Sequence, residues 1–134
     1  MNELLIGGIR KSNPEKHRGL RRHSLLPNDI RKRLPKLYSQ EGNKDPIVYL
    51  KFFSPYSNHT WYITEFDGKD TFFGYTIGNF SEWGYISYSE LQNANRNGLP
   101  LVERDKFFKP TKFSNIRKYW DETKKKEKIS KGFK

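Results

Sequence analysis

The sequence contains no cysteine and only three histidines among its 134 residues. The missing thiols exclude disulfide scaffolds, thiolate zinc sites, iron–sulfur clusters and cysteine nucleophiles. No apolar run approaches the roughly 18 residues that a membrane span needs. The first residues also lack the basic start and the continuous apolar stretch of a secretory signal. We therefore expect a soluble cytoplasmic protein with a single domain.

Aromatic residues are absent from residues 1–36, although the chain has three Trp, eight Tyr and ten Phe. Fifteen of these aromatics lie in residues 37–104, where the net charge is −3. The segments on either side, residues 1–36 and 105–134, each carry +7 of the total charge of +11. This distribution predicts a folded, mildly acidic aromatic centre between two basic ends.

The composition divides the chain into three predicted segments: a basic, flexible arm (1–24), one α+β domain (25–120) and a Lys-rich helix end and tail (121–134). Residues 1–23 are predicted to have no secondary structure, because Gly and Pro interrupt them repeatedly. A solvated tail and an arm that becomes ordered on phosphate both fit this pattern.

The centre predicts the α+β class: a small antiparallel sheet with short helices packed against it. A hairpin at Asp67-Gly68 is expected to join two strands of a three-stranded meander. A fourth strand and an extended edge segment at residues 99–105 follow it. The predicted strands are 46–53, 59–66, 71–78 and 84–87. The predicted helices are 28–34, a short one behind the capping box of Ser87 and Glu90, and 115–129 capped by Ser114.

Several motifs occur in a fixed order within this centre. They are LLPNDIRKRLPKLYSQEG (25–42), DPIVYLKFFSP (45–55), TWYITE (60–65), FFG (72–74), EWGYISYSEL (82–91) and LPLVERDKFFKP (99–110). Together they resemble a bacterial domain-of-unknown-function family that is often carried by plasmids, conjugative elements and phages. The resemblance implies accessory biology of a mobile element and supplies no catalytic residues.

Catalytic and metal-binding patterns are weak in this sequence. His59 with Glu65 or Asp67 would make only a partial metal site, and three protein ligands are usual. Asp45, followed by Asp67-Gly68-Lys69, mimics the layout of a metal-dependent nuclease, in which paired acids hold Mg²⁺. The second acid, however, is better explained as part of a turn. We therefore expect no enzyme activity, no catalytic residue, no metal and no cofactor.

The basic ends suit contacts with nucleic-acid phosphates, which depend on charge and carry no sequence information. The candidate contacts are the exposed cations of the arm, of the first predicted helix and of the last one. They are Arg10, Lys11, Arg18, Arg21, Arg22, Arg31, Lys32, Arg33, Lys124, Lys125 and Lys126.

Half of the strand aromatics should face the core, and the other half should be free to contact a partner. The acidic charge of this segment disfavours unpaired bases and favours a protein partner. The candidate partner-binding residues are Tyr62, Trp83, Tyr85, Glu103, Arg104 and Asp105. Alternatively, the last three form an ion-pair network with Lys51 or Arg31, and Glu41 and Glu65 pair with arginines of the first helix.

These observations predict a non-enzymatic accessory protein of a mobile element that docks on a host protein or ribonucleoprotein complex. A counter-defence inhibitor of the anti-CRISPR or anti-restriction type would fit this description. The alternative is a simple nucleic-acid-binding protein for replication or conjugation, and a metal-dependent nuclease ranks third. The expected partners are a host protein and RNA or DNA phosphates, with no membrane contact.

Overall fold

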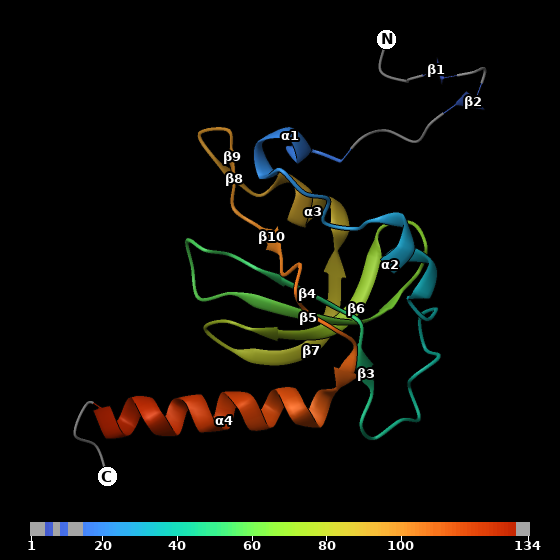
Figure 1. The fold of residues 1–134 in the computed structure, drawn as a ribbon. Helices are drawn as coiled ribbons and strands as arrows, with labels where there is room; N and C mark the ends of the chain where they lie inside the picture. Colours follow the sequence, from blue (N-terminus) through green and yellow to red (C-terminus); the bar gives the residue numbers. More distant parts are fainter. Residues whose placement is uncertain (1–4, 7–8, 11–14, 131–134) are drawn as a thin grey trace.

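The computed structural model describes residues 5–6, 9–10 and 15–130. Its centre is a five-stranded antiparallel sheet in the order β10-β4-β5-β6-β7 (Figure 1). The strands are β4 (Leu50–Phe53), β5 (Thr60–Phe66), β6 (Thr71–Ile77), β7 (Ser81–Ser87) and β10 (Glu103–Arg104). With its helices, the molecule is an α+β protein, as predicted.

The remaining elements are short strand pairs and four helices. The pairs are β1 (Leu5–Ile6) with β2 (Ile9–Arg10), β3 (Ile47–Val48) with β11 (Thr111–Lys112), and β8 (Asn95–Arg96) with β9 (Leu99–Pro100). The helices are α1 (Arg18–Arg21), α2 (Asn28–Arg33), α3 (Tyr88–Asn93) and α4 (Phe113–Ser130). In the described part of the chain, none of these helices is long and apolar enough to cross a membrane.

The predicted meander is confirmed as β4, β5 and β6, and its turn forms at Asp67-Gly68 as predicted. The Asp67 carboxylate accepts hydrogen bonds from the backbone N–H groups of Lys69, Asp70 and Thr71, which closes the β5–β6 turn. The predicted fourth strand is longer than expected, because β7 pairs with β6 along its whole length. The capping box is also confirmed, since the Ser87 hydroxyl accepts from the Glu90 N–H at the start of α3.

The main core lies on one face of the sheet. Apolar side chains from four sheet strands meet the segment around α2, helix α3 and the chain before β10. The buried residues are Leu25, Leu26, Leu34, Leu50, Phe52, Ile63, Phe66, Phe72, Ile86, Tyr88, Leu91 and Val102. Removal of this apolar surface from water is the main favourable contribution to folding.

The opposite face of the sheet carries a smaller core under the first half of α4. Figure 1 shows α4 on the side of the sheet away from α1 and α3. Tyr62 of β5, Phe113 and Ile116 are buried there, and Trp120 Nε1 donates to the Tyr62 hydroxyl at 2.7 Å. The prediction that Tyr62 is an outward-facing partner anchor is therefore wrong. Its side chain is only 2% exposed, because α4 covers it.

A bulge in β5 decides which side chains share this second face. The pairing of β5 with β6 shifts between Ile63 and Glu65, so one extra residue enters β5 at Thr64. Tyr62 and Glu65 consequently point to the same face, although they are three residues apart. Opposite the bulge, Gly74 lies so close that an added Cβ would be 2.1 Å from the Tyr62 carbonyl oxygen.

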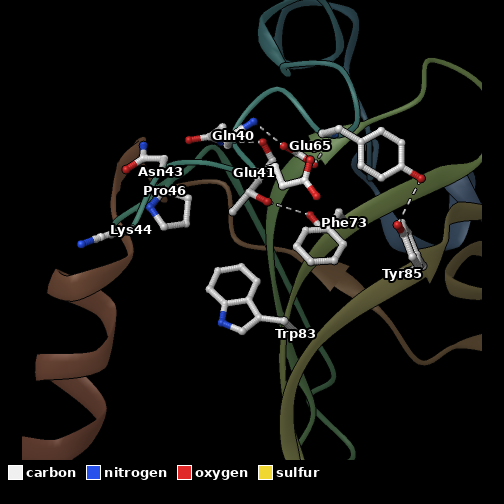
Figure 2. A pocket seen from close by; sticks show the side chains of 11 residues that line it. Gln40, Glu41, Asn43, Lys44, Pro46, Glu65, Phe73, Trp83 and Tyr85 are labelled. Carbon is white, nitrogen blue, oxygen red and sulfur yellow. Dashed lines mark hydrogen bonds between the residues drawn. The ribbon is translucent and has the colours of Figure 1, made fainter.

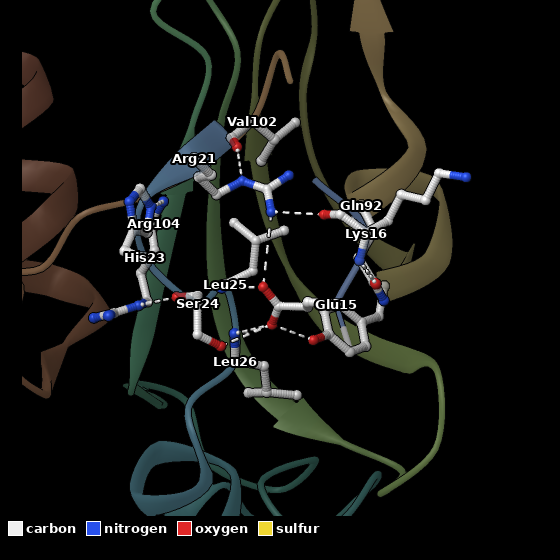
Figure 3. Close-up of polar contacts among 11 residues, drawn as sticks. Glu15, Lys16, Arg21, His23, Ser24, Leu25, Leu26, Gln92, Val102 and Arg104 are labelled. Atoms are coloured by element: carbon white, nitrogen blue, oxygen red, sulfur yellow. Dashed lines mark hydrogen bonds and ion pairs between the residues drawn. The ribbon is translucent and has the colours of Figure 1, made fainter. Parts of the chain in front are cut away.

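The N-terminal segment contains structure that the sequence did not predict. Residues 1–23 were expected to have no secondary structure. This is wrong for Leu5–Ile6 and Ile9–Arg10, which form β1 and β2, and for Arg18–Arg21, which form α1. Glu15 holds this segment on the domain (Figure 3). Its carboxylate accepts hydrogen bonds from the backbone N–H groups of Leu25 and Leu26 and from the Ser24 and Tyr88 hydroxyls.

Arg21 completes this polar cluster and is buried instead of solvated. Its guanidinium lies 3.7 Å from the Glu15 carboxylate, and its Nε donates to the Val102 carbonyl at 2.7 Å. Only 5% of the residue is exposed, so the expectation that Arg21 contacts phosphate from a solvated arm is wrong. These bonds cross the predicted boundary between residues 24 and 25, so residues 15–24 are attached to the domain.

Candidate functional site: an open aromatic pocket

Strands β6 and β7 place four aromatic side chains side by side on the second face of the sheet. Phe73 is directly opposite Tyr85 in the register, and Tyr75 is opposite Trp83. Phe113, the first residue of α4, packs on Tyr75 and Trp83 with ring centroids 4.9 and 4.6 Å away. Beyond this contact the aromatic surface is open, and Trp83 is 37% and Tyr85 60% exposed.

The loop before β3 forms the opposite wall and turns this open surface into a pocket of about 280 Å³ (Figure 2). We call this hollow the aromatic pocket. Its lining residues are Tyr38, Gln40, Glu41, Asn43, Lys44, Pro46, Thr64, Glu65, Phe73, Trp83 and Tyr85. It therefore joins one loop to three neighbouring strands of the sheet.

The Glu65 carboxylate holds the loop wall in place. One oxygen accepts from the Tyr38 backbone N–H at 2.9 Å, and the other accepts from the Gln40 N–H at 2.6 Å. Glu65 is only 4% exposed, because the β5 bulge directs its side chain under the loop. The expectation that Glu65 pairs with an arginine of the first helix is therefore wrong, since its hydrogen-bond partners are backbone amides and no arginine of the described residues lies within 4.0 Å of it.

The Gln40 side chain fastens the same loop to the sheet. Its Nε2 donates to the carbonyl oxygens of Ile47 and Thr64, at 3.0 and 2.9 Å. Its Oε1 accepts from the Ile47 N–H at 2.8 Å. Every polar atom of this side chain is bonded to backbone, so Gln40 fixes the distance between the loop and β5.

Tyr38 adopts a backbone conformation that is costly for a residue with a side chain. Its φ of 72° lies in the left-handed region, which costs an L-residue roughly 1–2 kcal/mol. The bond from its N–H to Glu65 offsets this cost. The Tyr38 hydroxyl accepts a hydrogen bond from Tyr85 at 3.2 Å, and this bond raises the pKa of Tyr85. Tyr38 therefore ties the loop to the sheet twice, through its N–H to Glu65 of β5 and through its hydroxyl to Tyr85 of β7.

The predicted phosphate contacts that the structure describes fall into three sets: the N-terminal segment with β2 and α1, helix α2, and helix α4. Arg10 belongs to β2, and Lys11 lies outside the described residues. Arg18 and Arg22 are exposed at α1. The exposed cations of the two longer helices are Arg31, Lys32 and Arg33 on α2 and Lys124, Lys125 and Lys126 on α4. The described structure does not bring these three sets together at the aromatic pocket.

Two of the α2 arginines already have intramolecular partners. Arg31 donates from Nη2 to the Gly68 carbonyl at 2.7 Å and lies 5.3 Å from the Phe66 ring centroid. Arg33 is 3.8 Å from the carboxylate of Asp29 on the same exposed helix face, a kind of pair that contributes little to stability. Within the described residues neither arginine pairs with Glu41, which corrects that expectation.

The charged run at the end of the predicted edge segment is part of the sheet. Glu103 and Arg104 form β10, which pairs with β4, and Arg104 Nε donates to the Ser24 carbonyl at 2.7 Å. Asp105 lies 3.5 Å from the ammonium of Lys51. The ion-pair alternative is thus confirmed for Lys51, whereas Arg104 is used to hold the chain around Ser24.

The acidic residues of the nuclease pattern have separate structural partners. Both carboxylate oxygens of Asp45 bond to Ser114, at 2.8 Å to its N–H and 2.7 Å to its hydroxyl, which lowers the pKa of Asp45. The expectation that Ser114 caps the last helix is therefore corrected, because Asp45 accepts at that end. His59 stacks on Trp61. Within the described residues, no three His, Asp or Glu side chains converge as metal ligands would.

The fold and the pocket define a small α+β protein with an aromatic pocket whose loop wall is held by hydrogen bonds. Residues 25–130 match a family described as a protein of unknown function, DUF2958. The chain belongs to this family, which confirms the resemblance seen in its motifs. Searches of curated proteins and of solved structures found no significant match.

The sequence analysis identified two lining residues of the pocket, Trp83 and Tyr85, but missed the residues that hold its loop in place. Tyr38 and Gln40 were not singled out, because nothing in the sequence near them indicates a contact with β5. Glu65 carried a usable signal, since it is the one charged residue in the strand TWYITEF. A charged side chain in a buried strand is rarely left without a partner.

Proposed function

We propose that this protein is a non-catalytic accessory protein that acts in the cytoplasm by docking on a protein–nucleic acid complex. The aromatic pocket faces the protein component, and the basic helices face the nucleic acid. The observation that carries this proposal is the pocket itself. It is an exposed aromatic surface held by a bonded loop and not covered by another element of the described structure.

The pocket has the properties of an interface anchor. Exposed Trp and Tyr side chains are enriched among residues that dominate binding energy at protein interfaces. The bonds of Glu65 and Gln40 hold the loop before any partner arrives, and a rigid site loses less conformational entropy on binding. The acidic side chains in this region disfavour phosphate and so support a protein partner at this position.

The basic surfaces support contact with the nucleic-acid component of the same complex. Lys124, Lys125 and Lys126 follow Trp120, the last α4 residue assigned to the core on the second face. Exposed lysines of this kind suit phosphate contacts, whose strength falls steeply as salt rises. Because these lysines and the pocket belong to different parts of the protein, both surfaces can be occupied together.

More specifically, we propose that the protein is a counter-defence inhibitor of a mobile element, of the anti-CRISPR or anti-restriction type. The competing function is that of a simple nucleic-acid-binding protein for replication or conjugation, which the exposed α4 lysines favour. The two functions differ in which surface a partner needs, so paired variants separate them.

The test begins with a complex captured on the full chain from a host extract, with and without nuclease treatment. Affinity for that complex is then measured for Trp83→Ala with Tyr85→Ala, and for a control, Phe80→Ala with Phe107→Ala, whose rings are exposed elsewhere. The double variant Trp83→Ala with Tyr85→Ala, called the pocket pair, should bind the complex at least about 30-fold more weakly, since losing an anchor costs about 2 kcal/mol or more. The control pair should bind normally.

A third variant removes the charge of Lys124, Lys125 and Lys126 by substitution with Gln. For a docking protein this variant should mainly slow association and reduce its salt dependence. If the charge variant abolishes binding while the folded pocket variant binds normally, the protein is a nucleic-acid binder and the docking proposal is wrong. Circular dichroism establishes that each variant is folded.

A further inference from the structure

We propose that the aromatic pocket recognises an arginine side chain of the protein partner. This inference rests on the proposed docking function and adds the chemistry of the group that enters the pocket. Three features of the site carry it: a buried carboxylate without a cation, a flat aromatic platform, and a volume suited to one side chain.

The first feature is the Glu65 carboxylate. It lines the pocket and is buried, and among the described residues no Lys, Arg or His lies within 4.0 Å of it. Each oxygen accepts one backbone N–H, whereas an ionised carboxylate has about four acceptor positions. A buried anion without a cation is unfavourable, so a positive group that enters the pocket is attracted to it.

The second feature is the arrangement of the aromatic rings. Phe73 and Trp83 are nearly parallel, with an interplanar angle of 10° and centroids 5.9 Å apart, so they form one platform. Tyr85 stands at 67° to Phe73 and forms a wall, as Figure 2 shows. A cation above such faces is attracted by the ring electrons.

Guanidinium fits this combination better than ammonium does. It is planar, it stacks on aromatic rings, and it donates two parallel hydrogen bonds to one carboxylate. Glu41 supplies a second carboxylate among the lining residues and is exposed. An arginine can therefore lie on the Phe73–Trp83 platform while its donors approach the acidic side chains.

The third feature is size. A hollow of about 280 Å³ is just below the roughly 300–1,000 Å³ of small-molecule sites. It suits one long side chain better than a nucleotide cofactor. The two carboxylates also oppose the phosphate of an RNA or DNA nucleotide, and among the described residues Lys44 is the one cation that lines the pocket.

The test is a titration of the full chain followed by NMR on the backbone N–H groups of Phe73 and Tyr85, which line the pocket and are present in every variant below. The probe is N-acetyl-arginine methylamide, and the controls are its neutral citrulline counterpart, the lysine counterpart and uridine monophosphate. We expect saturable shifts with the arginine probe, and binding at least about tenfold weaker with citrulline, since charge-assisted hydrogen bonds are about twice as strong as neutral ones. Equal binding of citrulline, or preference for the nucleotide or for lysine, would overturn the proposal.

Variants locate the binding. Trp83→Leu and Glu41→Gln should each weaken the arginine probe several-fold, and Phe107→Ala should leave its binding unchanged. Glu65→Gln should also weaken it, but this change affects the bonds to Tyr38 and Gln40 and can disturb the loop. The first two variants therefore decide the question, and unchanged binding in both would show that arginine binds elsewhere.

The proposed function and this inference fail in different ways. If the arginine probe does not bind but the pocket pair loses the captured complex, docking stands and the arginine assignment is wrong. If the arginine probe binds the pocket but the pocket pair retains the complex, the docking proposal is wrong.

Discussion

Two carboxylates of this protein, Glu15 and Glu65, act as anchors for backbone N–H groups of distant segments. Glu15 accepts from Leu25 and Leu26, and Glu65 accepts from Tyr38 and Gln40. Charge-assisted bonds of this type are stronger than neutral ones, and they satisfy amides that no strand or helix pairs. At the scale of single residues, buried acids thus hold the irregular parts of the chain.

Glu15→Gln should destabilise the protein by roughly 3 kcal/mol, because it leaves the buried Arg21 guanidinium without its anion. The side chains of this pair are 0% and 6% exposed. The matched control is Asp29→Asn, which breaks the exposed pair with Arg33 and should cost less than about 0.5 kcal/mol. Urea unfolding of both variants measures the difference, and equal losses would contradict it.

The same acid should contribute to acid sensitivity. Burial raises the pKa of Glu15, but the bonds from Tyr88, Leu25, Leu26 and Ser24 outweigh it, so the folded pKa is below its ordinary 4.5. A lowered carboxyl pKa adds stability that is present above the ordinary value and is lost as pH falls through the folded value. Unfolding free energy measured below pH 4.5 should therefore fall less in Glu15→Gln than in the parent.

His23 should make stability depend on pH in a higher range. Burial and the nearby Arg104 lower the pKa of His23 below its ordinary 6.5, and its Nε2 accepts from the Arg104 N–H at 2.9 Å. As pH falls, His23 therefore takes up a proton at a higher pH in the unfolded chain than in the folded protein. Its contribution to stability is fully present above pH 6.5 and declines as pH falls below that value. His23→Ala should reduce the slope of melting temperature against pH between about pH 6.5 and 5. An unchanged slope in this variant would show that other groups cause the decline.

At the scale of elements, the β5 bulge organises the second face of the sheet. It turns Tyr62 toward α4 and Glu65 toward the loop, so one irregularity serves both the small core and the aromatic pocket. A regular strand would alternate strictly and would send one of these two side chains to the main core. Bulges of this kind often re-aim a side chain near a functional site.

Gly74→Ala tests how tightly β5 and β6 approach at the bulge. The new methyl group would lie 2.1 Å from the Tyr62 carbonyl oxygen, and relief of this overlap requires backbone movement, which should cost at least about 2 kcal/mol. Gly84→Ala is the matched control, because Gly84 is paired with Gly74 and has nothing within 4 Å of an added Cβ. Thermal melts should show a large loss for the first variant only.

At the scale of the whole molecule, the cations proposed to contact phosphate and the open aromatic surface lie on different elements. These cations are on α1, α2 and α4, and the aromatic surface is on β6 and β7 beside the loop that carries Glu41. This separation allows two partners of opposite character to bind one small domain. It follows the sequence in part, because the aromatic centre forms the sheet, whereas Arg21 of the basic N-terminal segment is buried.

Binding of RNA or DNA should be electrostatic and should depend on the end of α4. Changing Lys124, Lys125 and Lys126 to Gln should reduce the slope of log affinity against log salt by about 2 to 3. The control removes the same charge from exposed Lys36, Lys69 and Arg96 and should change the slope much less. Fluorescence anisotropy across a salt series measures both slopes, and equal changes would contradict a localised contact.

Local patterns in the sequence determined the class of the fold and most of its sheet. The apolar and aromatic runs of β5 and β6, the Asp67-Gly68 turn and the Ser87 cap depend on neighbouring residues, and each appears where it was predicted. The order of the motifs was also sufficient to indicate the family. Such features are readable because the contacts that create them lie within a few residues.

Contacts between distant residues decided the rest. Arg21 donates to Val102 and Tyr62 accepts from Trp120 across 81 and 58 positions, and no local pattern indicates either bond. The aromatic pocket needs the bulge, the left-handed Tyr38 and the Gln40 bonds together. Burial of a charge or an aromatic ring depends on what packs over it, and only the tertiary structure determines that.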